Sequence, residues 1–246
     1  MALAAWRMGA LTAAGAGTAT LVGTLVLAGT GWAGGLVLGV FFISSSIVSE
    51  MTSSASFPSD PKGNQRDPWQ VVANGGPAAV AALLGFDHPS LALWTLTASL
   101  AAGGADTWAT ALGALSRTPP RLLVGWQPVP AGTSGGVTLV GSSGGLAGAA
   151  VVAGTGALAG GGAHLLAAGT LIGFAGMLVD SALGGTLQGR FFCPRCETAS
   201  EWRVHRCGEA TVGTGGIAWL NNDAVNLVAT SLAAVAGAAA WRCWAS

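Results

Sequence analysis

The chain has 246 residues, of which 51% are hydrophobic and only 8% are charged, and its mean hydropathy is +0.59. Polar side chains are too few to cover a water-soluble globular domain, so the composition excludes that class and predicts a single integral membrane domain over residues 1–246, surrounded by membrane lipid. Ten basic residues balance ten acidic ones. This balance gives no indication of a nucleic-acid partner, and we expect none; the oligomeric state is not readable from the sequence.

Seven stretches are long and apolar enough for transmembrane helices, which need about 20 residues. In chain order they are Gly9–Ala28, Trp32–Ser49, Trp69–Phe86, Ser90–Leu112, Gly135–Leu158, His164–Gln188 and Asp223–Trp244. The predicted fold class is therefore an all-α membrane protein, a polytopic bundle of about seven transmembrane helices. The 40 glycines lie mainly within runs of Ala, Leu and Val, where small residues let membrane helices approach closely.

Three long polar loops are predicted on one side of the membrane, at Glu50–Pro68, Gly113–Ser134 and Gly189–Asn222. Nine of the ten basic residues lie on this side, and Arg242 lies opposite. The nine are Arg7, Lys62, Arg66, Arg117, Arg121, Arg190, Arg195, Arg203 and Arg206. Because basic residues favour cytoplasmic loops, we expect the N-terminus and the long loops to be cytosolic. The membrane would be the plasma membrane in a prokaryote and an organelle membrane in a eukaryote.

Three acidic residues, Asp106, Asp180 and Asp223, lie in the predicted spans toward the side that carries the long loops. Charged residues inside a membrane are costly and commonly functional. The amides Asn74, Asn222 and Asn226 belong to the same end. Oxygen ligands of this kind suit Mg²⁺, which proteins usually hold with one or two carboxylates and substrate phosphates. A lone intramembrane Asp also has a simpler interpretation, a hydrogen bond to a neighbouring helix.

Groups suited to phosphate also lie on the side of the long loops. Arg66 and Arg121 supply guanidinium groups that match phosphate oxygens. The segment Gly132-Thr133-Ser134-Gly135-Gly136 precedes the fifth predicted span, and such a loop presents backbone N–H groups to an anion. It lacks the Gly-Lys-Ser/Thr ending of a P-loop, and a flexible entry turn explains it equally well.

A cysteine cluster marks the third polar loop. Cys193, Cys196, His205 and Cys207 lie within 15 residues, which is typical of a small tetrahedral Zn²⁺ site with a structural role. The alternative is a set of reduced thiols beside an unrelated histidine. The loop at residues 189–222 is therefore a candidate zinc-binding element.

Successive blocks along almost the whole chain resemble one membrane-protein family. The blocks include Phe41-Phe-Ile-Ser-Ser-Ser, Asn64-Gln-Arg, Gln70-Val-Val-Ala-Asn-Gly, Ala105-Asp-Thr-Trp-Ala-Thr, Val129-Pro-Ala-Gly-Thr-Ser-Gly-Gly, Val179-Asp-Ser-Ala-Leu-Gly-Gly-Thr-Leu-Gln and Leu220-Asn-Asn-Asp-Ala-Val-Asn. The family contains plant phytyl-phosphate kinase, many uncharacterised prokaryotic proteins and an uncharacterised animal transmembrane protein. One departure stands out: this chain has Ala111 where the family usually carries a glutamate.

The resemblance implies a membrane-embedded prenyl-phosphate kinase, a transferase of isoprenoid metabolism that converts an isoprenoid monophosphate to the diphosphate. Asp106, Asp180 and Asp223 would then hold Mg²⁺ on a nucleoside triphosphate, either ATP or CTP, and Asn74, Asn222 and Asn226 would complete the polar shell. Arg66, Arg121 and the loop at Gly132–Gly136 would bind phosphates. A transporter is the first alternative, although transporters place substrate near the bilayer midplane; a non-catalytic scaffold, favoured by Ala111, is the second.

Overall fold

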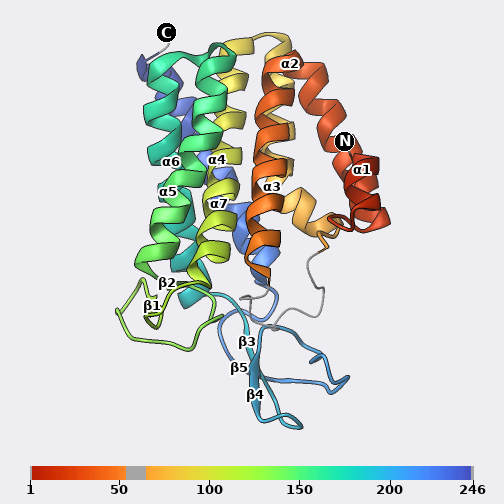
Figure 1. Cartoon of the computed structure of the whole chain (residues 1–246), viewed down its shortest axis with the longest axis vertical. Coiled ribbons are helices and arrows are strands. Elements are labelled where there is room, and N and C mark those ends of the chain that lie inside the picture. The colour runs from red at the N-terminus through yellow and green to blue at the C-terminus, as the bar shows by residue number, and fades with distance from the viewer. Residues whose placement is uncertain (1, 54–64, 245–246) are drawn as a thin grey trace.

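The structure is a computed structural model that describes residues 2–53 and 65–244. Most of it is a bundle of helices (Figure 1). The helices are α1 (Ala2–Arg7), α2 (Ala13–Met51), α3 (Pro68–Ala82) with the short η2 (Leu83–Phe86), α4 (Pro89–Gly113), α5 (Leu139–Gly156) with the short η3 (Ala157–Gly161), α6 (Gly162–Thr186) and α7 (Asn222–Trp244). Lys62 and Asn64, used above for charge and for the family resemblance, lie outside the described residues.

The chain reverses direction at glycines whose backbone conformation other residues rarely adopt. Gly31 divides α2 into two helices, with φ 59° and ψ −149°, and Gly160, with φ 118°, lies in the turn that joins α5 to α6. A positive φ is readily available to glycine because it lacks a Cβ. Figure 1 shows these reversals, together with the turn between α3 and α4, at one end of the bundle and the long connections at the other. We call the latter the loop end.

Helix α4 lies at the centre of the bundle and packs against α2, α3, α5, α6 and α7. Every residue from Ala92 to Ala105 is buried. Glycines on α5 permit the closest approach: a Cβ built on Gly148 would lie 2.9 Å from the Gly104 carbonyl oxygen, and one on Gly145 would lie 3.1 Å from that of Ala105. The predicted use of glycine as a packing surface is confirmed here, because these helices meet backbone to backbone.

The outer surface of the bundle is apolar. Exposed large hydrophobic side chains include Leu21, Trp32, Leu36, Leu158, Leu171 and Val235. Within the described residues, three helical segments are long and apolar enough to cross a membrane: Ala13–Met51, which contains the Gly31 turn, Leu139–Thr186, which contains the α5–α6 turn, and Asn222–Trp244. The protein therefore matches the predicted class of helical membrane proteins, since water does not favour such an apolar exterior.

All seven predicted spans coincide with helical segments, but two of them begin later than expected. α2 starts at Ala13, after Thr12 accepts a hydrogen bond from the Gly15 N–H. α5 starts at Leu139, after Thr138 accepts one from the Gly141 N–H at 2.9 Å. In both cases a threonine side chain satisfies a free N–H of the first turn and so fixes the helix start. The apolar residues before each threonine lie outside the helix.

The expectation of a purely α-helical fold is incomplete, because the polar loops contain two small sheets. β1 (Arg121–Leu122) pairs antiparallel with β2 (Gly136–Val137). β3 (Arg190–Cys193), β4 (Thr198–Ser200) and β5 (Val212–Gly215) form an antiparallel sheet in the order β4-β3-β5. We call residues 190–215 the ribbon; it projects from the loop end of the bundle (Figure 1).

Candidate functional site

A cavity of about 830 Å³ opens at the loop end, where the ends of α2, α3, α4, α5, α6 and α7 meet the loops. It collects most of the polar residues predicted from the sequence. Those in its lining are Arg66, Asn74, Asp106, Gly132, Thr133, Ser134, Gly135, Gly136, Asp180, Asn222, Asp223 and Asn226. Residues up to 160 positions apart in sequence thus share one pocket, and Ala111, which stands where the resembling family usually has glutamate, also lines it.

Asp106 of α4 and Asp180 of α6 face the cavity from two packed helices. Their carboxylates are close enough to interact electrostatically. Asp180 is only 8% exposed, and its Oδ2 has no hydrogen-bond partner among the described residues. A buried carboxylate with no partner and a like charge nearby is expensive for the fold. The arrangement is therefore one that a bound cation would stabilise.

The first turns of α7 add a third carboxylate and two amides. Asp223 is partly buried, Asn222 is exposed and Asn226 is buried, and all three line the cavity. The Thr230 hydroxyl, one turn further along α7, donates to the Ala73 carbonyl at 2.7 Å. This bond links α7 to α3 next to Asn74 and fixes the position of α7 along its axis relative to α3.

Arg66 is the more buried of the two arginines that line the cavity, since Arg117 is exposed. The backbone of Arg66 pairs with the chain before α2, through Arg66 N–H to the Ala10 carbonyl at 3.1 Å and Thr12 N–H to the Arg66 carbonyl at 3.1 Å. Its Nη1 donates to Ser46 Oγ at 3.2 Å, and the guanidinium lies 5.2 Å from the Phe42 ring centroid. Desolvation by burial lowers the pKa of Arg66 to about 10, so it remains charged at neutral pH.

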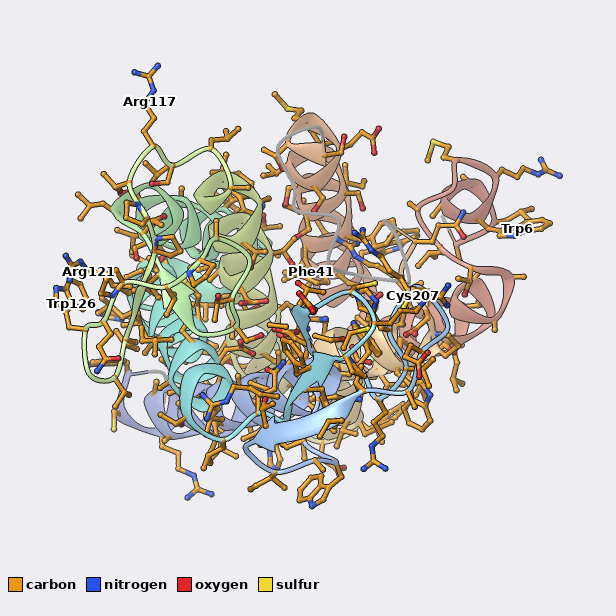
Figure 2. All side chains as sticks on the ribbon, turned by 90° about the horizontal axis from the view of Figure 1, so that it is seen from below. Trp6, Phe41, Arg117, Arg121, Trp126 and Cys207 are labelled. Atoms are coloured by element: carbon orange, nitrogen blue, oxygen red, sulfur yellow. The ribbon has the colours of Figure 1, made fainter. Side chains whose placement is uncertain are left out.

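Arg121, the second predicted phosphate ligand, does not line the cavity. It lies on β1, where its Nη1 donates to the Trp126 carbonyl at 2.9 Å and its guanidinium lies 5.9 Å from the Trp126 ring centroid. Figure 2, which looks onto the loop end, shows this pair at the outer edge of the molecule. The structure therefore brings Arg66 together with the acids and leaves Arg121 apart.

The glycine-rich loop at Gly132–Gly136 is anchored directly on α6. A Cβ on Gly135 would collide with the backbone of Gly185 and of Ser181, and the φ of Gly135 is +79°. The Thr133 hydroxyl donates to the Pro130 carbonyl at 2.7 Å and closes the turn. The loop thus packs against α6 between Ser181, which follows Asp180 directly, and Gly185, on the same helix that carries the buried acid.

Glu201 of the ribbon is a cavity residue that sequence reasoning missed. It accepts hydrogen bonds from the Ser134 hydroxyl and, at 3.1 Å, from Gln188 Nε2. Gln188 Nε2 also donates to Ser134 Oγ at 3.1 Å, and Gln188 is 2% exposed. These bonds connect the ribbon to the glycine-rich loop and to the end of α6. Nothing in the local sequence distinguishes Glu201 from an ordinary surface acid.

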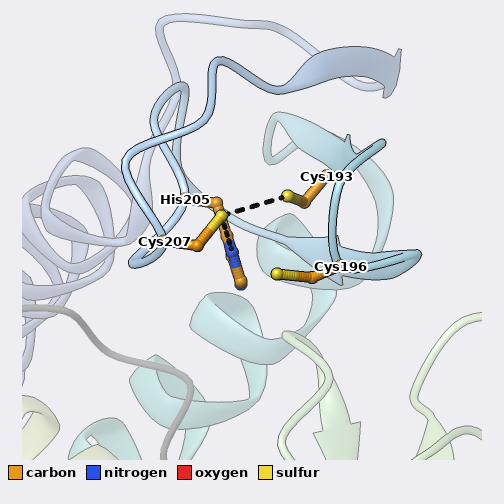
Figure 3. Close-up of side chains that lie close together, drawn as sticks. All are labelled: Cys193, Cys196, His205 and Cys207. Atoms are coloured by element: carbon orange, nitrogen blue, oxygen red, sulfur yellow. Dashed lines mark hydrogen bonds between the residues drawn. The ribbon is translucent and has the colours of Figure 1, made fainter.

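The predicted cysteine cluster comes together in the ribbon, as Figure 3 shows. The ligand atoms of Cys193, Cys196, His205 and Cys207 all lie within 4.8 Å of one another. Hydrogen bonding, chiefly with His205, lowers the pKa of the Cys207 thiol to about 6, and the neighbouring Cys207 thiol is the main cause that raises the pKa of Cys196 to about 11. Cys243 lies in α7, outside the cluster.

Together, the apolar bundle and the oxygen-lined cavity at its end define a polytopic helical membrane protein with a polar site at one membrane boundary. The chain belongs to the family described as integral membrane protein DUF92, whose model matches residues 1–234. The family predicted from the sequence blocks is thereby confirmed. No solved structure is significantly similar to this chain.

The relatives of this chain span plants, archaea and cyanobacteria. It is 28% identical over 229 residues to Protein PGR of Arabidopsis thaliana, covering 80% of this chain and 78% of that protein. It is 28% identical over 218 residues to an uncharacterized membrane protein of Methanocaldococcus jannaschii, covering 89% and 80%. An uncharacterized membrane protein of Synechocystis is 32% identical over 192 residues, covering 74% and 73%.

Proposed function

We propose that the protein is a membrane-embedded prenyl-phosphate kinase, which transfers the γ-phosphoryl group of ATP or CTP to an isoprenoid monophosphate. The observation that carries this proposal is the meeting of two interacting carboxylates, the buried Asp180 and the partly buried Asp106, with the partly buried Arg66 in one cavity. Acids to hold a metal–nucleotide complex and a cation to hold phosphate are the parts that phosphoryl transfer requires. The family resemblance supplies the isoprenoid acceptor.

The residues of the cavity fit Mg²⁺. All the candidate ligands are oxygens, as Mg²⁺ prefers, and Asp180 Oδ2 is buried without a hydrogen-bond partner among the described residues. Asp106 and Asp180 would hold the ion, with Asp223 and the amides of Asn74, Asn222 and Asn226 completing the polar shell. When bound, Mg²⁺ neutralises charge on the nucleotide phosphates.

The remaining chemistry is positioning. An oxygen of the prenyl monophosphate attacks the γ-phosphorus, the bond from that phosphorus to the β-phosphate bridging oxygen breaks, and the nucleoside diphosphate leaves. The acceptor oxygens are already largely ionised near neutral pH, so no strong general base is needed. Arg66 would hold one phosphate, and the N–H groups of Gly132–Gly136 would hold another. The part of the cavity wall formed by the ribbon would restrict the access of water to the phosphates. The isoprenoid tail would remain among the apolar helices.

The same proposal includes seven membrane crossings with the loop end in the cytosol. The alternation of turns and long connections between the two ends supports it, as does the basic character of the loops. A membrane-impermeant maleimide applied to intact cells should label Cys243, which is exposed near the end of α7. A cysteine introduced as Arg117→Cys, at an exposed loop position, should react only in inside-out vesicles. Labelling of both residues from one side would contradict the three crossings, by α5, α6 and α7, that the proposal places between them.

The direct test is transfer of labelled γ-phosphate from ATP or CTP to phytyl, farnesyl and geranylgeranyl phosphates, by the purified full chain in detergent with Mg²⁺. A diphosphate product that requires Mg²⁺ would support the kinase. Absence of product with every acceptor, in folded protein that retains native lipid, would reject it. Nucleotide binding would then separate the alternatives: a scaffold predicts none, and a transporter predicts substrate flux in proteoliposomes.

Arg66 and Arg121 give a matched test of phosphate binding. Arg66→Gln is expected to raise the KM for a phosphate substrate by about 10- to 100-fold, since hydrogen bonds to charged groups contribute roughly 1.5–3 kcal/mol. Arg121→Gln, outside the cavity lining, should stay within about twofold of the parent.

The control for the structural contacts of Arg66 is Ser46→Ala, which removes its hydrogen bond to Arg66 and keeps the charge. If Ser46→Ala raises the KM as much as Arg66→Gln does, Arg66 acts only by supporting the wall. The melting temperature of each variant in detergent, compared with that of the parent, shows whether a change in KM comes from a loss of stability.

A further inference from the structure

The ribbon places four metal-binding side chains at two facing turns. Cys193 ends β3 and Cys196 lies in the turn to β4, while His205 and Cys207 lie in a second turn. This second turn is closed by Gly208 N–H to the His205 carbonyl at 2.8 Å and His205 N–H to the Glu209 carbonyl at 2.9 Å. Two such turns that face each other are the geometry in which small zinc-binding elements hold their ion.

The distances fit one tetrahedral ion. Cys193 Sγ lies 3.7 Å from Cys207 Sγ, and His205 Nδ1 lies 3.2 Å from Cys207 Sγ. Zn–S bonds of about 2.3 Å in a tetrahedron place two sulfurs about 3.8 Å apart. A disulfide would need an S–S distance of about 2.05 Å and would leave the other two side chains unexplained. Three thiols with one imidazole suit zinc, whereas iron–sulfur clusters are usually held by four cysteines.

The ribbon also has too little apolar burial to hold its own shape. Within residues 190–215, only Phe191 and Cys193 are buried, and every residue of β5 is exposed. Small elements without a hydrophobic core generally need a disulfide or a metal ion for stability. A metal at the cysteine cluster would fill this role.

We propose that Cys193, Cys196, His205 and Cys207 bind a structural Zn²⁺, and that this ion holds the ribbon in the shape that carries Glu201 to the wall of the cavity. Glu201 lies between the two turns in sequence and bonds to Ser134 of the glycine-rich loop and to Gln188 at the end of α6. None of the four proposed zinc ligands lines the cavity. The effect of the ion is to keep one wall of the cavity in place.

Metal analysis of the purified full chain tests the ion itself. We expect one zinc per chain in the parent and in Cys243→Ser, whose cysteine is exposed and outside the cluster. Cys196→Ser and Cys207→Ser should each retain at most about a tenth of the zinc that Cys243→Ser binds. A parent protein that carries no zinc, or carries iron in its place, overturns the proposal, and so does full zinc occupancy in Cys196→Ser.

Limited trypsin digestion tests the structural role without relying on variants that fold poorly. The ribbon contains four arginines, Arg190, Arg195, Arg203 and Arg206. After zinc is removed from the parent with a chelator, cleavage at these sites should be at least ten times faster, and added Zn²⁺ but not Mg²⁺ should restore protection. Equal cleavage with and without zinc would refute the structural role. Neither readout depends on kinase activity, so failure of the zinc proposal and failure of the proposed function remain distinguishable.

Discussion

Replacement of Asp180 by asparagine is expected to reduce Mg²⁺-dependent phosphoryl transfer by about 10²- to 10³-fold, the size of effect seen when one preorganised charge contact is removed from an active site. The same change should leave the melting temperature in detergent unchanged or raise it. The carboxylate is buried, lacks a hydrogen-bond partner at Oδ2 and interacts with Asp106, so its removal relieves repulsion. Asp106→Asn should lower activity in the same way.

The matched control for both variants is Asp87→Asn. Asp87 is exposed in the turn after η2, at the opposite end of the bundle, and its replacement should change neither activity nor stability. Full activity in Asp180→Asn would refute the metal assignment. Loss of activity together with a lower melting temperature would indicate that Asp180 serves the packing of α6 and holds no ion.

Gly135→Ala is expected to damage the loop end strongly although it adds only one methyl group. The residue has a positive φ, which costs a non-glycine residue about 1–2 kcal/mol, and the added Cβ would collide with backbone atoms of α6. Backbone atoms of a packed helix cannot turn aside as a side chain can. The glycine-rich loop must therefore move away from α6, and both stability and phosphate binding should fall.

Gly125→Ala isolates the collision from the conformational cost. Gly125 has a similar φ of +86°, but a Cβ there would meet no atom within 4 Å. We expect a melting temperature for Gly135→Ala clearly below that of Gly125→Ala, and a KM for the nucleotide raised about tenfold or more only in Gly135→Ala. Equal behaviour of the two variants would show that the loop contact with α6 contributes nothing beyond backbone strain.

The helices and the grouping of the acids could be predicted from the sequence for a simple reason. Apolar stretches of membrane-spanning length define the helices, and their alternation across the bundle assigns every loop to one end or the other. The grouping of Asp106, Asp180 and Asp223 follows from this alternation, since each lies toward the loop end of the bundle in its own helix. The prediction required no knowledge of how the helices pack.

Other features depend on contacts that no local pattern encodes. β1 and β2 are two residues long and carry no readable alternation, so the position of Arg121 on β1, beside Trp126, could not be anticipated. Glu201 reaches the cavity only through the fold of the ribbon. The short helix α1 precedes the first predicted span and was not expected. The cysteine cluster was predictable because metal-ligand spacing is itself a sequence pattern.

The central position of α4 has a consequence for how the protein enters the membrane. Its buried face is rich in Gly, Ala, Ser and Thr, and it is absent from the helices apolar enough to cross a bilayer unaided. Other helices surround α4 where lipid would otherwise contact it. A chain truncated after Gly113 should therefore retain α2 in the bilayer and leave α4 accessible to added protease, whereas in a chain extended through α6 the same helix should be protected. We therefore expect insertion of this helix to be completed only by helices that are synthesised after it.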